Sequence, residues 1–193
     1  SDGLLGEKQT DFTELKAAGA AAFSDDGRPV TSDAMMRKAL QDGAELNCAV
    51  ISHCEAITLS KGGVMNEGPS QQKLGVKGQP NSAEDLMIAR DAVLAAETGC
   101  PVHIAHVSTK SGMEIVRTAK AHGVPITCEA CPHHFTLTDE AVEKWGADAK
   151  MSPPLRSEKD RLAVIEAIRD GTVDMISTDH APHALAEKAL GLT

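Results

Sequence analysis

The sequence predicts an α/β protein, specifically a partial (β/α)8 barrel of parallel strands. Short apolar segments alternate with longer amphipathic ones along the chain, which is the pattern of strands joined by right-handed helical crossovers. Five strand candidates occur within 193 residues, whereas a complete eightfold barrel takes about 250. A doubly wound open sheet is the competing architecture, but the glycine-rich phosphate turn typical of that fold does not follow the first strand.

The first two strand candidates, residues 20–24 and 48–52, flank a helical pattern over residues 32–46. Within that pattern Met35, Met36, Ala39 and Leu40 recur at the spacing of one helix face. These residues are therefore expected to pack against the sheet.

A glycine-rich segment, residues 56–80, follows the second strand. It is too long for an ordinary connection, so we expect it to carry function or to lie across the mouth of the barrel. An adaptable surface loop is the alternative.

The second half of the chain continues the alternation. Ser82 and Asp85 have the spacing of a capping box and predict the start of a helix over residues 83–99. Gly123 suits the left-handed end of another helix, and Ser157 with Asp160 opens a third. The remaining elements expected in chain order are strands at 102–107, 124–130 and 173–177 and helices at 110–123, 139–145 and 157–171.

The composition argues against several classes of partner. Aromatic residues make up 2% of the chain and Tyr is absent, so a surface that stacks bases or sugars is not expected. The formal charge of -9 includes no basic run, which makes nucleic acid and anionic membrane poor partners. No stretch reads as a signal peptide or as an apolar span of about 18 residues, so no membrane segment is predicted.

The five cysteines indicate reduced thiols and a cytoplasmic protein. They are odd in number and lie mostly in apolar, strand-like context, which does not suggest a disulfide framework. Cys128 and Cys131 form a C-x-x-C, but the second pair that a structural zinc site needs is missing.

Ionisable side chains follow every predicted strand. In chain order they are Asp25 and Asp26, then His53, then His103 and His106, then Glu129, His133 and His134, and finally Asp179, His180 and His183. The carboxyl ends of barrel strands converge on one mouth, and imidazole and carboxylate groups are ligands of divalent metals such as zinc. Although a single histidine is more commonly structural, five such strand ends together predict a metal site.

Four roles follow for this site. One histidine after the second strand and one after the third would supply nitrogen ligands, and a carboxylate after the first would be able to bridge two ions. Asp179 would ligate metal and take a proton from the metal-bound water. Binding to zinc lowers the pKa of such a water to about 7. His180 or His183 would bind substrate or order the ligands. By strand alternation, His103 and His106 point to opposite faces.

Six motifs carry a resemblance to a known family. FSDDG, SHCE, HIAHVSTKSG, CPHHFTLTDE, KMSPPLRSEKDR and DGTVDMISTDHAPH occur in the order seen in bacterial class I dihydroorotases of the amidohydrolase superfamily, and the similarity covers almost the entire chain. The resemblance implies a TIM barrel, of which residues 1–193 form a single domain, and a zinc centre of one or two ions. It also implies the reversible cyclisation of N-carbamoyl-L-aspartate to L-dihydroorotate, a step of pyrimidine biosynthesis.

The resemblance also implies roles for individual residues. Asp26 corresponds to the carboxylate between two metals, His53 and His106 to single-histidine ligands, Asp179 to a ligand that is also the general base and acid, and His183 and Ser152 to substrate contacts. His103 is expected to serve packing. The partners implied are a small-molecule substrate and, as a candidate, aspartate transcarbamoylase.

The sequence departs from the family pattern in three places. The family's first strand carries His-x-His-x-Arg, but no His-x-His occurs here; Ser152 stands where Asn is usual, and Ala56 where Asp is usual. We therefore expect the first strands and the last to lie outside the given sequence. Otherwise self-association, as a homo-oligomer, would have to cover the exposed edges of an open barrel.

Two alternative functions stay open. A hydantoinase- or allantoinase-like amidohydrolase would open related rings, but it would carry a lysine on the first strand, where aspartates stand here. A non-catalytic structural partner of aspartate transcarbamoylase is the other alternative, because the His-x-His motif is missing.

Overall fold

The computed structural model describes residues 1–192, and a sheet of five parallel strands in the order β1-β2-β5-β6-β7 forms its centre. The strands are β1 (Ala22–Ser24), β2 (Ala49–Ser52), β5 (Val102–Ile104), β6 (Ile126–Ala130) and β7 (Met175–Ile176). Each of them lies within one of the five predicted strands. Val102 pairs with Val50 on one side and with Ile126 on the other.

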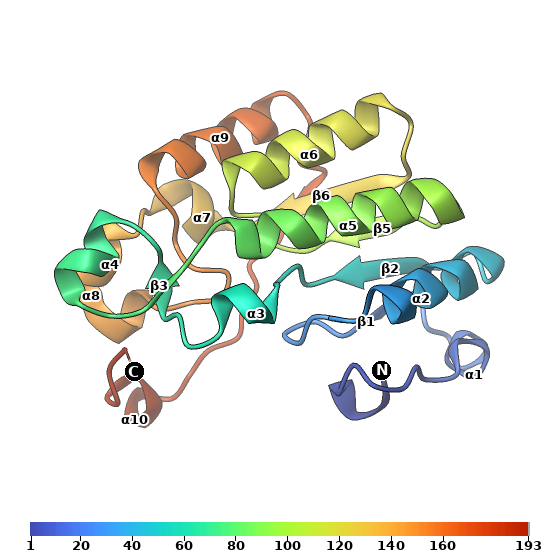
Figure 1. Ribbon diagram of the computed structural model, residues 1–193, viewed down its shortest axis with the longest axis horizontal. Helices are drawn as coiled ribbons and strands as arrows, with labels where there is room; N and C mark the ends of the chain where they lie inside the picture. Colours follow the sequence, from blue (N-terminus) through green and yellow to red (C-terminus); the bar gives the residue numbers. More distant parts are fainter. Residues whose placement is uncertain (193) are drawn as a thin grey trace.

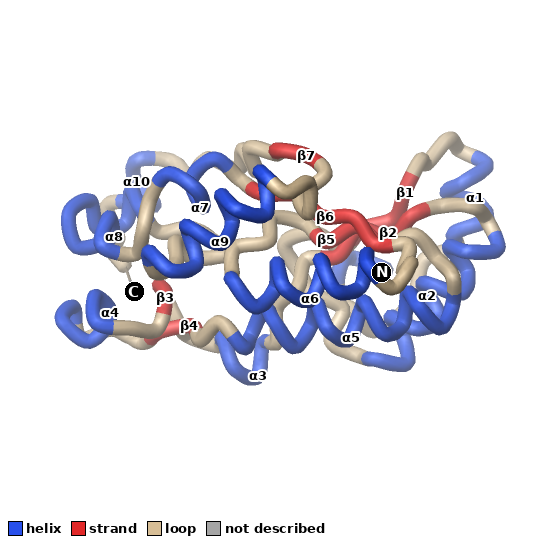
Figure 2. Tube along the Cα trace, turned by 90° about the horizontal axis from the view of Figure 1, so that it is seen from above, coloured by secondary structure: helices blue, strands red, loops and turns tan. Residues whose placement is uncertain are grey.

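Four helices connect and cover these strands. They are α2 (Asp33–Glu45), α5 (Ser82–Thr98), α6 (Lys110–Ala121) and α9 (Glu158–Arg169). Each packs against the next, and Figures 1 and 2 show them as one layer on one side of the sheet. Crossovers that all use one face belong to a barrel, whereas a doubly wound sheet has helices on both faces. The architecture is therefore a partial barrel, as predicted.

The main apolar core lies between this helix layer and the sheet. Leu40, Ile88, Ile104, Val116 and Val164 come from five different elements, and all of them are fully buried there. Burying one side chain of this size contributes about 1.5–3 kcal/mol. This core fixes the strands whose ends carry the predicted site.

The helix starts show one correct and one wrong prediction. Ser157 caps α9 by accepting the backbone N–H of Asp160. The capping box predicted for Ser82 and Asp85 is wrong, because α5 already includes Ser82 and its N-cap is Asn81. The Asn81 side chain makes no cap hydrogen bond; its amide instead donates to the Asp160 carboxylate at 2.9 Å.

The long segment after β2 has secondary structure of its own. It contains α3 (Ile57–Ser60), β3 (Met65–Asn66), α4 (Pro69–Leu74) and β4 (Gly78–Gln79), and β3 pairs with β4 in parallel. A Cβ at Gly78 would lie 2.7 Å from the Glu67 Cα, so glycine permits this close approach. Figure 1 shows β3 and α4 beyond the carboxyl ends of the main strands. The segment is therefore a structured part of that end.

The remaining elements are short. They are η1 (Asp2–Leu4), α1 (Phe12–Ala17), α7 (Pro132–Thr136), α8 (Glu140–Trp145), η2 (Gly146–Ala149) and α10 (Leu185–Lys188). Within residues 1–192, no helix combines the length and the apolar character needed to cross a bilayer.

The last strand differs from its prediction. An apolar strand between helices is expected to be buried, but Met175 and Ile176 are each 50% exposed. The physical reason is position, because β7 stands at the edge of the sheet and pairs only with β6 among the described residues. The apolar edge is consistent with a barrel of which these strands form only a part.

Candidate metal centre

A cleft of about 550 Å³ lies at the carboxyl ends of the strands. All six residues predicted for the site contribute to its lining: Asp26, His53, His106, Ser152, Asp179 and His183. His133, Lys150 and Lys188 line it as well. The fold thus brings side chains from five separate parts of the chain to one cavity.

Asp26, His53 and His106 form a compact cluster at one wall of the cleft. The distance from His53 Nδ1 to His106 Nε2 is 2.9 Å, and Asp26 Oδ1 lies 3.7 Å from the first nitrogen and 3.6 Å from the second. Ligand atoms about 2.0–2.1 Å from a tetrahedral zinc ion lie roughly 3.3 Å apart. The three observed separations fall on both sides of that value, so this donor set fits one such ion.

Glu55 orients the His53 ring. His53 Nε2 lies 3.1 Å from Glu55 Oε2, and hydrogen bonding to this imidazole lowers the pKa of the Glu55 carboxyl, although burial opposes the shift. A ring that donates Nε2–H to a carboxylate leaves the lone pair of Nδ1 free, as metal-binding histidines do. Glu55 was not among the predicted site residues. The sequence feature that could have identified it is an acidic residue two positions after a histidine at the end of a strand.

His106 occupies an unusual backbone conformation just beyond β5. Its φ of 36° lies in the left-handed region, which few non-glycine residues adopt. The Glu129 carboxylate holds it there, because Oε1 accepts the His106 backbone N–H at 3.3 Å while Oε2 lies 3.2 Å from His103 Nε2. His103 also contacts Thr127 Oγ1 at 2.8 Å. Its ring is therefore engaged with β6, apart from the Asp26 cluster.

The pKa values of the cluster reflect the pairing of opposite charges. Burial lowers the pKa of the His106 imidazole, but the hydrogen bond and charge of Asp26 outweigh it, so the net shift is upward. In turn the hydrogen bond from His106 lowers the pKa of Asp26. The carboxylate of Asp26 therefore favours positive charge at this end of the cluster.

The structure also distinguishes the two adjacent aspartates after β1. Asp25 is 8% exposed, whereas the Asp26 side chain is 51% exposed and faces the two imidazoles. Only Asp26 lines the cleft with them. The two residues therefore have separate surroundings despite their adjacency.

The segment after β7 supplies the opposite part of the lining. Asp179 is half-buried and has a φ of 47°, again in the left-handed region. His183 lines the cleft with a largely exposed ring, 3.7 Å from Glu187 Oε2. His180 is exposed and is not part of the lining. Of the two histidines left open by the sequence, His183 is the one that faces the cavity.

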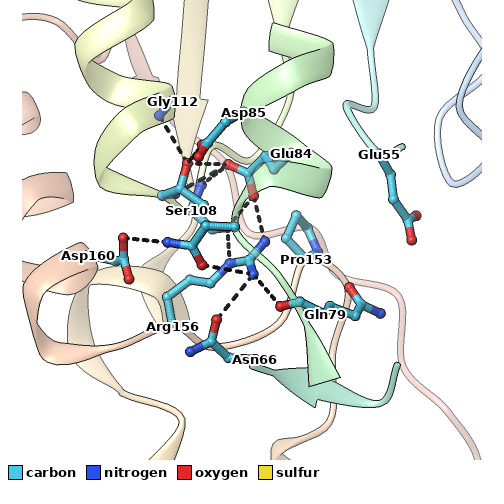
Figure 3. Close-up of polar contacts among 12 residues, drawn as sticks. Glu55, Asn66, Gln79, Glu84, Asp85, Ser108, Gly112, Pro153, Arg156 and Asp160 are labelled. Atoms are coloured by element: carbon cyan, nitrogen blue, oxygen red, sulfur yellow. Dashed lines mark hydrogen bonds and ion pairs between the residues drawn. The ribbon is translucent and has the colours of Figure 1, made fainter. Parts of the chain in front are cut away.

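A buried network centred on Arg156 lies four residues after Ser152 in the sequence. The Arg156 guanidinium donates to Glu84 Oε2 at 3.1 Å and to Ser108 Oγ at 3.0 Å. Ser108 and Glu84 are hydrogen-bonded in turn, the Ser108 backbone N–H lying 2.7 Å from Glu84 Oε1. Figure 3 shows the guanidinium at the centre of these contacts. Since Ser108 follows His106 by two residues, this network fixes the loop that carries a cluster histidine.

The same guanidinium reaches the segment between β2 and α5. Arg156 Nη1 lies 3.2 Å from Asn66 Oδ1, from the Gln79 carbonyl and from Asn81 Oδ1. Arg156 and Glu84 are each 4% exposed. A buried ion pair of this kind is stable only with such complete hydrogen bonding. The β3–β4 unit is therefore tied to the same side of the cleft as Ser152.

Comparison with known proteins identifies relatives of this chain. The family described as Dihydro-orotase-like matches residues 3–112. The chain is 52% identical over 188 residues to a dihydroorotase of Acetivibrio thermocellus, covering 97% of this chain and 44% of the relative. It is 55% identical over 186 residues to a dihydroorotase of Pelotomaculum thermopropionicum, covering 96% and 44%. The chain thus spans less than half the length of these relatives.

Solved structures share the fold. An L-hydantoinase (dihydropyrimidinase) from Arthrobacter aurescens matches with a TM-score of 0.77 at 25% identity, over 92% of this chain and 42% of that one. A D-hydantoinase from Thermus sp. matches with a TM-score of 0.75 at 27% identity, over 95% and 43%. Together with the sequence relatives, these matches show that the chain belongs to the dihydroorotase-like family.

Proposed function

We propose that this chain forms the metal-binding part of a zinc-dependent cyclic amidohydrolase that interconverts N-carbamoyl-L-aspartate and L-dihydroorotate in pyrimidine biosynthesis. The observation that carries the proposal is the single cleft shared by the Asp26–His53–His106 cluster and Asp179. The similarity to dihydroorotases at 52% and 55% identity supports the choice of substrate.

Asp26, His53 and His106 would hold zinc through one carboxylate oxygen and two imidazole nitrogens, with Asp26 able to bridge a second ion. When bound, zinc would polarise the ring amide. It would also lower the pKa of water, so that a nucleophile would be available near neutral pH. Glu55 would keep the His53 imidazole in its ligand orientation, and Glu129 would hold the His106 backbone.

Asp179 would act as the general base and acid, and would also ligate the metal. On ring opening it would take a proton from the attacking water and deliver it to the leaving ring nitrogen; in the biosynthetic direction the proton moves the opposite way. His183 and Ser152 would contact the substrate. Lys150 and Lys188, the two lysines of the lining, would attract its carboxylate.

We propose further that residues 1–193 form one domain of a cytoplasmic homo-oligomer. The exposed apolar edge strand β7 supports a covering partner, either further strands of the same polypeptide or a second subunit. Aspartate transcarbamoylase is a candidate partner only through the family resemblance.

A hydantoinase-like activity is the second candidate function. The likeness to L- and D-hydantoinases, with TM-scores of 0.77 and 0.75, favours it. The higher identity to dihydroorotases and the aspartates after β1 favour dihydroorotate instead. Turnover of dihydroorotate, hydantoin and allantoin by the same preparation distinguishes the two, and no turnover of any of them supports a non-catalytic role.

Asp179→Asn tests the mechanism in the full gene product that carries this sequence. We expect turnover of dihydroorotate to fall by about 10²–10⁴, the typical contribution of a general acid–base group, while zinc measured by plasma emission is retained at least in part. His122→Asn, a change at an exposed residue at the end of α6, is the control and should leave turnover unchanged. Near wild-type turnover in Asp179→Asn would show that the assignment is wrong.

A further inference from the structure

A second group of metal-ligating side chains follows β6. Cys131, His133 and His134 lie at the start of α7, and one ligand atom from each falls within 4.8 Å of the others. Cys131 is fully buried, His134 is 3% exposed, and His133 lines the cleft. None of the three belongs to the Asp26–His53–His106 cluster, so this group needs an explanation of its own.

Of the two ring nitrogens of His134, one is hydrogen-bonded and the other is not. Its Nε2 lies 3.0 Å from the Pro153 carbonyl, to which it donates. That bond leaves the lone pair on Nδ1, and this atom is buried without a hydrogen-bond partner among residues 1–192. An unpaired buried polar atom costs about 1–3 kcal/mol. Metal-binding histidines commonly donate their second nitrogen to a carbonyl in this way.

Cys131 differs from the other four cysteines. The thiols of Cys48, Cys54, Cys100 and Cys128 each contact an oxygen acceptor, namely the Ala20 carbonyl, the Asp91 carboxylate, the Cys48 carbonyl and the Thr172 carbonyl. In the part of the chain that the structure describes, no such contact is found for the Cys131 thiol. Burial raises the pKa of Cys131 to about 12, so the thiol stays protonated until a cation replaces the proton.

We propose that Cys131, His133 and His134 form a second site, for a thiophilic divalent ion such as zinc or cadmium. Thiolate sulfur and imidazole nitrogen are both ligands that zinc accepts, and thiolate favours soft ions. On binding, the Cys131 S–H bond breaks, a sulfur–metal bond forms, and one proton leaves to solvent. His133 is the least buried member of the three.

The site opens to the same cleft as the Asp26 cluster, because His133 lines that cleft. The proposal of this second site does not rest on the proposed function. A negative result for the second site would therefore not affect the proposed function.

Cobalt(II) titration of the metal-depleted gene product tests the proposal. The Asp26–His53–His106 donor set contains no sulfur, so a near-ultraviolet thiolate-to-cobalt charge-transfer band would report a cysteine-containing site, which the Cys131→Ser variant assigns. We expect this band in the wild-type protein and its loss in Cys131→Ser. Cys128→Ser is the matched control, because Cys128 is buried three residues away with a thiol pKa of about 12, and it should keep the band.

Absence of the band in the wild-type protein, or its survival in Cys131→Ser, would overturn the proposal, and so would equal loss in both cysteine variants. If circular dichroism shows that Cys131→Ser does not fold, His133→Asn at the half-buried position carries the test. It should weaken the affinity measured by the band at least about tenfold, as loss of even an indirect metal contact does. An unchanged titration of His133→Asn would equally overturn the assignment.

Discussion

Two groups of charges stand close together at the carboxyl end of the sheet and differ in how completely they are paired. Around Arg156 every nitrogen of the guanidinium has an acceptor, and both Arg156 and Glu84 are 4% exposed. In the Asp26 cluster, one contact of 2.9 Å joins the two imidazoles, while Asp26 stays 3.6 Å and 3.7 Å away with its side chain half exposed. The first group is internally complete and the second is left open.

This difference separates a structural device from a binding site. Buried charges that satisfy one another hold segments together, here β3, β4, α5 and the loop after β5. Polar atoms that converge without closing on each other present a ready site for a cation. The predictions below test whether stability resides in the first group and metal binding in the second.

The largest expected effect is on stability, from Arg156→Met. This change leaves the Glu84 carboxylate buried without its cation, and breaking such a pair typically destabilises a protein by about 3–5 kcal/mol. Urea unfolding of the metal-free protein, followed by circular dichroism, measures the change. Arg37→Met is the matched control; its ion pair with Glu97 is about half exposed, so its unfolding midpoint should stay close to wild type. Equal effects of the two variants would contradict the contrast.

The next effect is the response of stability to zinc. A ligand that binds only the folded state at about 100 times its dissociation constant raises the free energy of unfolding by about 2.7 kcal/mol. We expect zinc to stabilise the wild-type protein in this way, and a chelator to reverse it. His106→Asn should abolish most of this gain with little change in metal-free stability, because His106 is paired mainly with groups that would share the ion.

Calorimetric titration with zinc at matched concentrations measures the same contrast directly. Glu114→Gln, at an exposed position on α6, serves as the control and should respond to zinc as the wild type does. If His106→Asn kept the full zinc stabilisation, the main ion would lie elsewhere in the molecule.

Much of this arrangement could be predicted from the sequence, and the reasons are local. The alternation of apolar and amphipathic segments located all five main strands, and Gly123, with a φ of 75°, follows the end of α6 as its type and position indicated. Side chains directly after parallel strands must meet at one edge of the sheet. For this reason Asp26, His53 and His106 could be expected together before their distances were known.

Other features depend on contacts that sequence spacing does not encode. The Arg156 network joins positions up to 90 residues apart. It engages the side chain of Asn81, the N-cap of α5, in contacts other than capping. The exposure of β7 follows from its place at the edge of the sheet, not from its apolar residues. The grouping of Cys131 with His133 and His134, in place of the C-x-x-C pair with Cys128, depends on the turn into α7. In each case a distant or irregular contact outweighed the local pattern.

The smallest expected effect concerns Asp85, a carboxyl near Arg156 whose negative charge is poorly stabilised by its neighbours. Burial raises the pKa of Asp85, and the hydrogen bond from the Thr109 hydroxyl lowers it. The negative charges of Glu84 and Asp160 raise this pKa further, by more than the positive charge of Arg156 lowers it. A carboxyl whose pKa is higher in the folded state than its ordinary 3.8 destabilises that state as pH rises through this range. Asp85→Asn keeps an acceptor for Thr109 without the charge.

The variant should therefore gain stability relative to wild type as pH rises from about 4 to 7, by a small amount because Asp85 is partly solvated. Urea unfolding of both proteins at several pH values measures the difference. Asp33→Asn, at an exposed position in the first turn of α2, should show no such gain. If Asp85→Asn lost stability relative to wild type at pH 7, Arg156 would have to stabilise the Asp85 carboxylate as fully as it stabilises that of Glu84. The charges at the edge of the Arg156 network would then all be paired, unlike those of the Asp26 cluster.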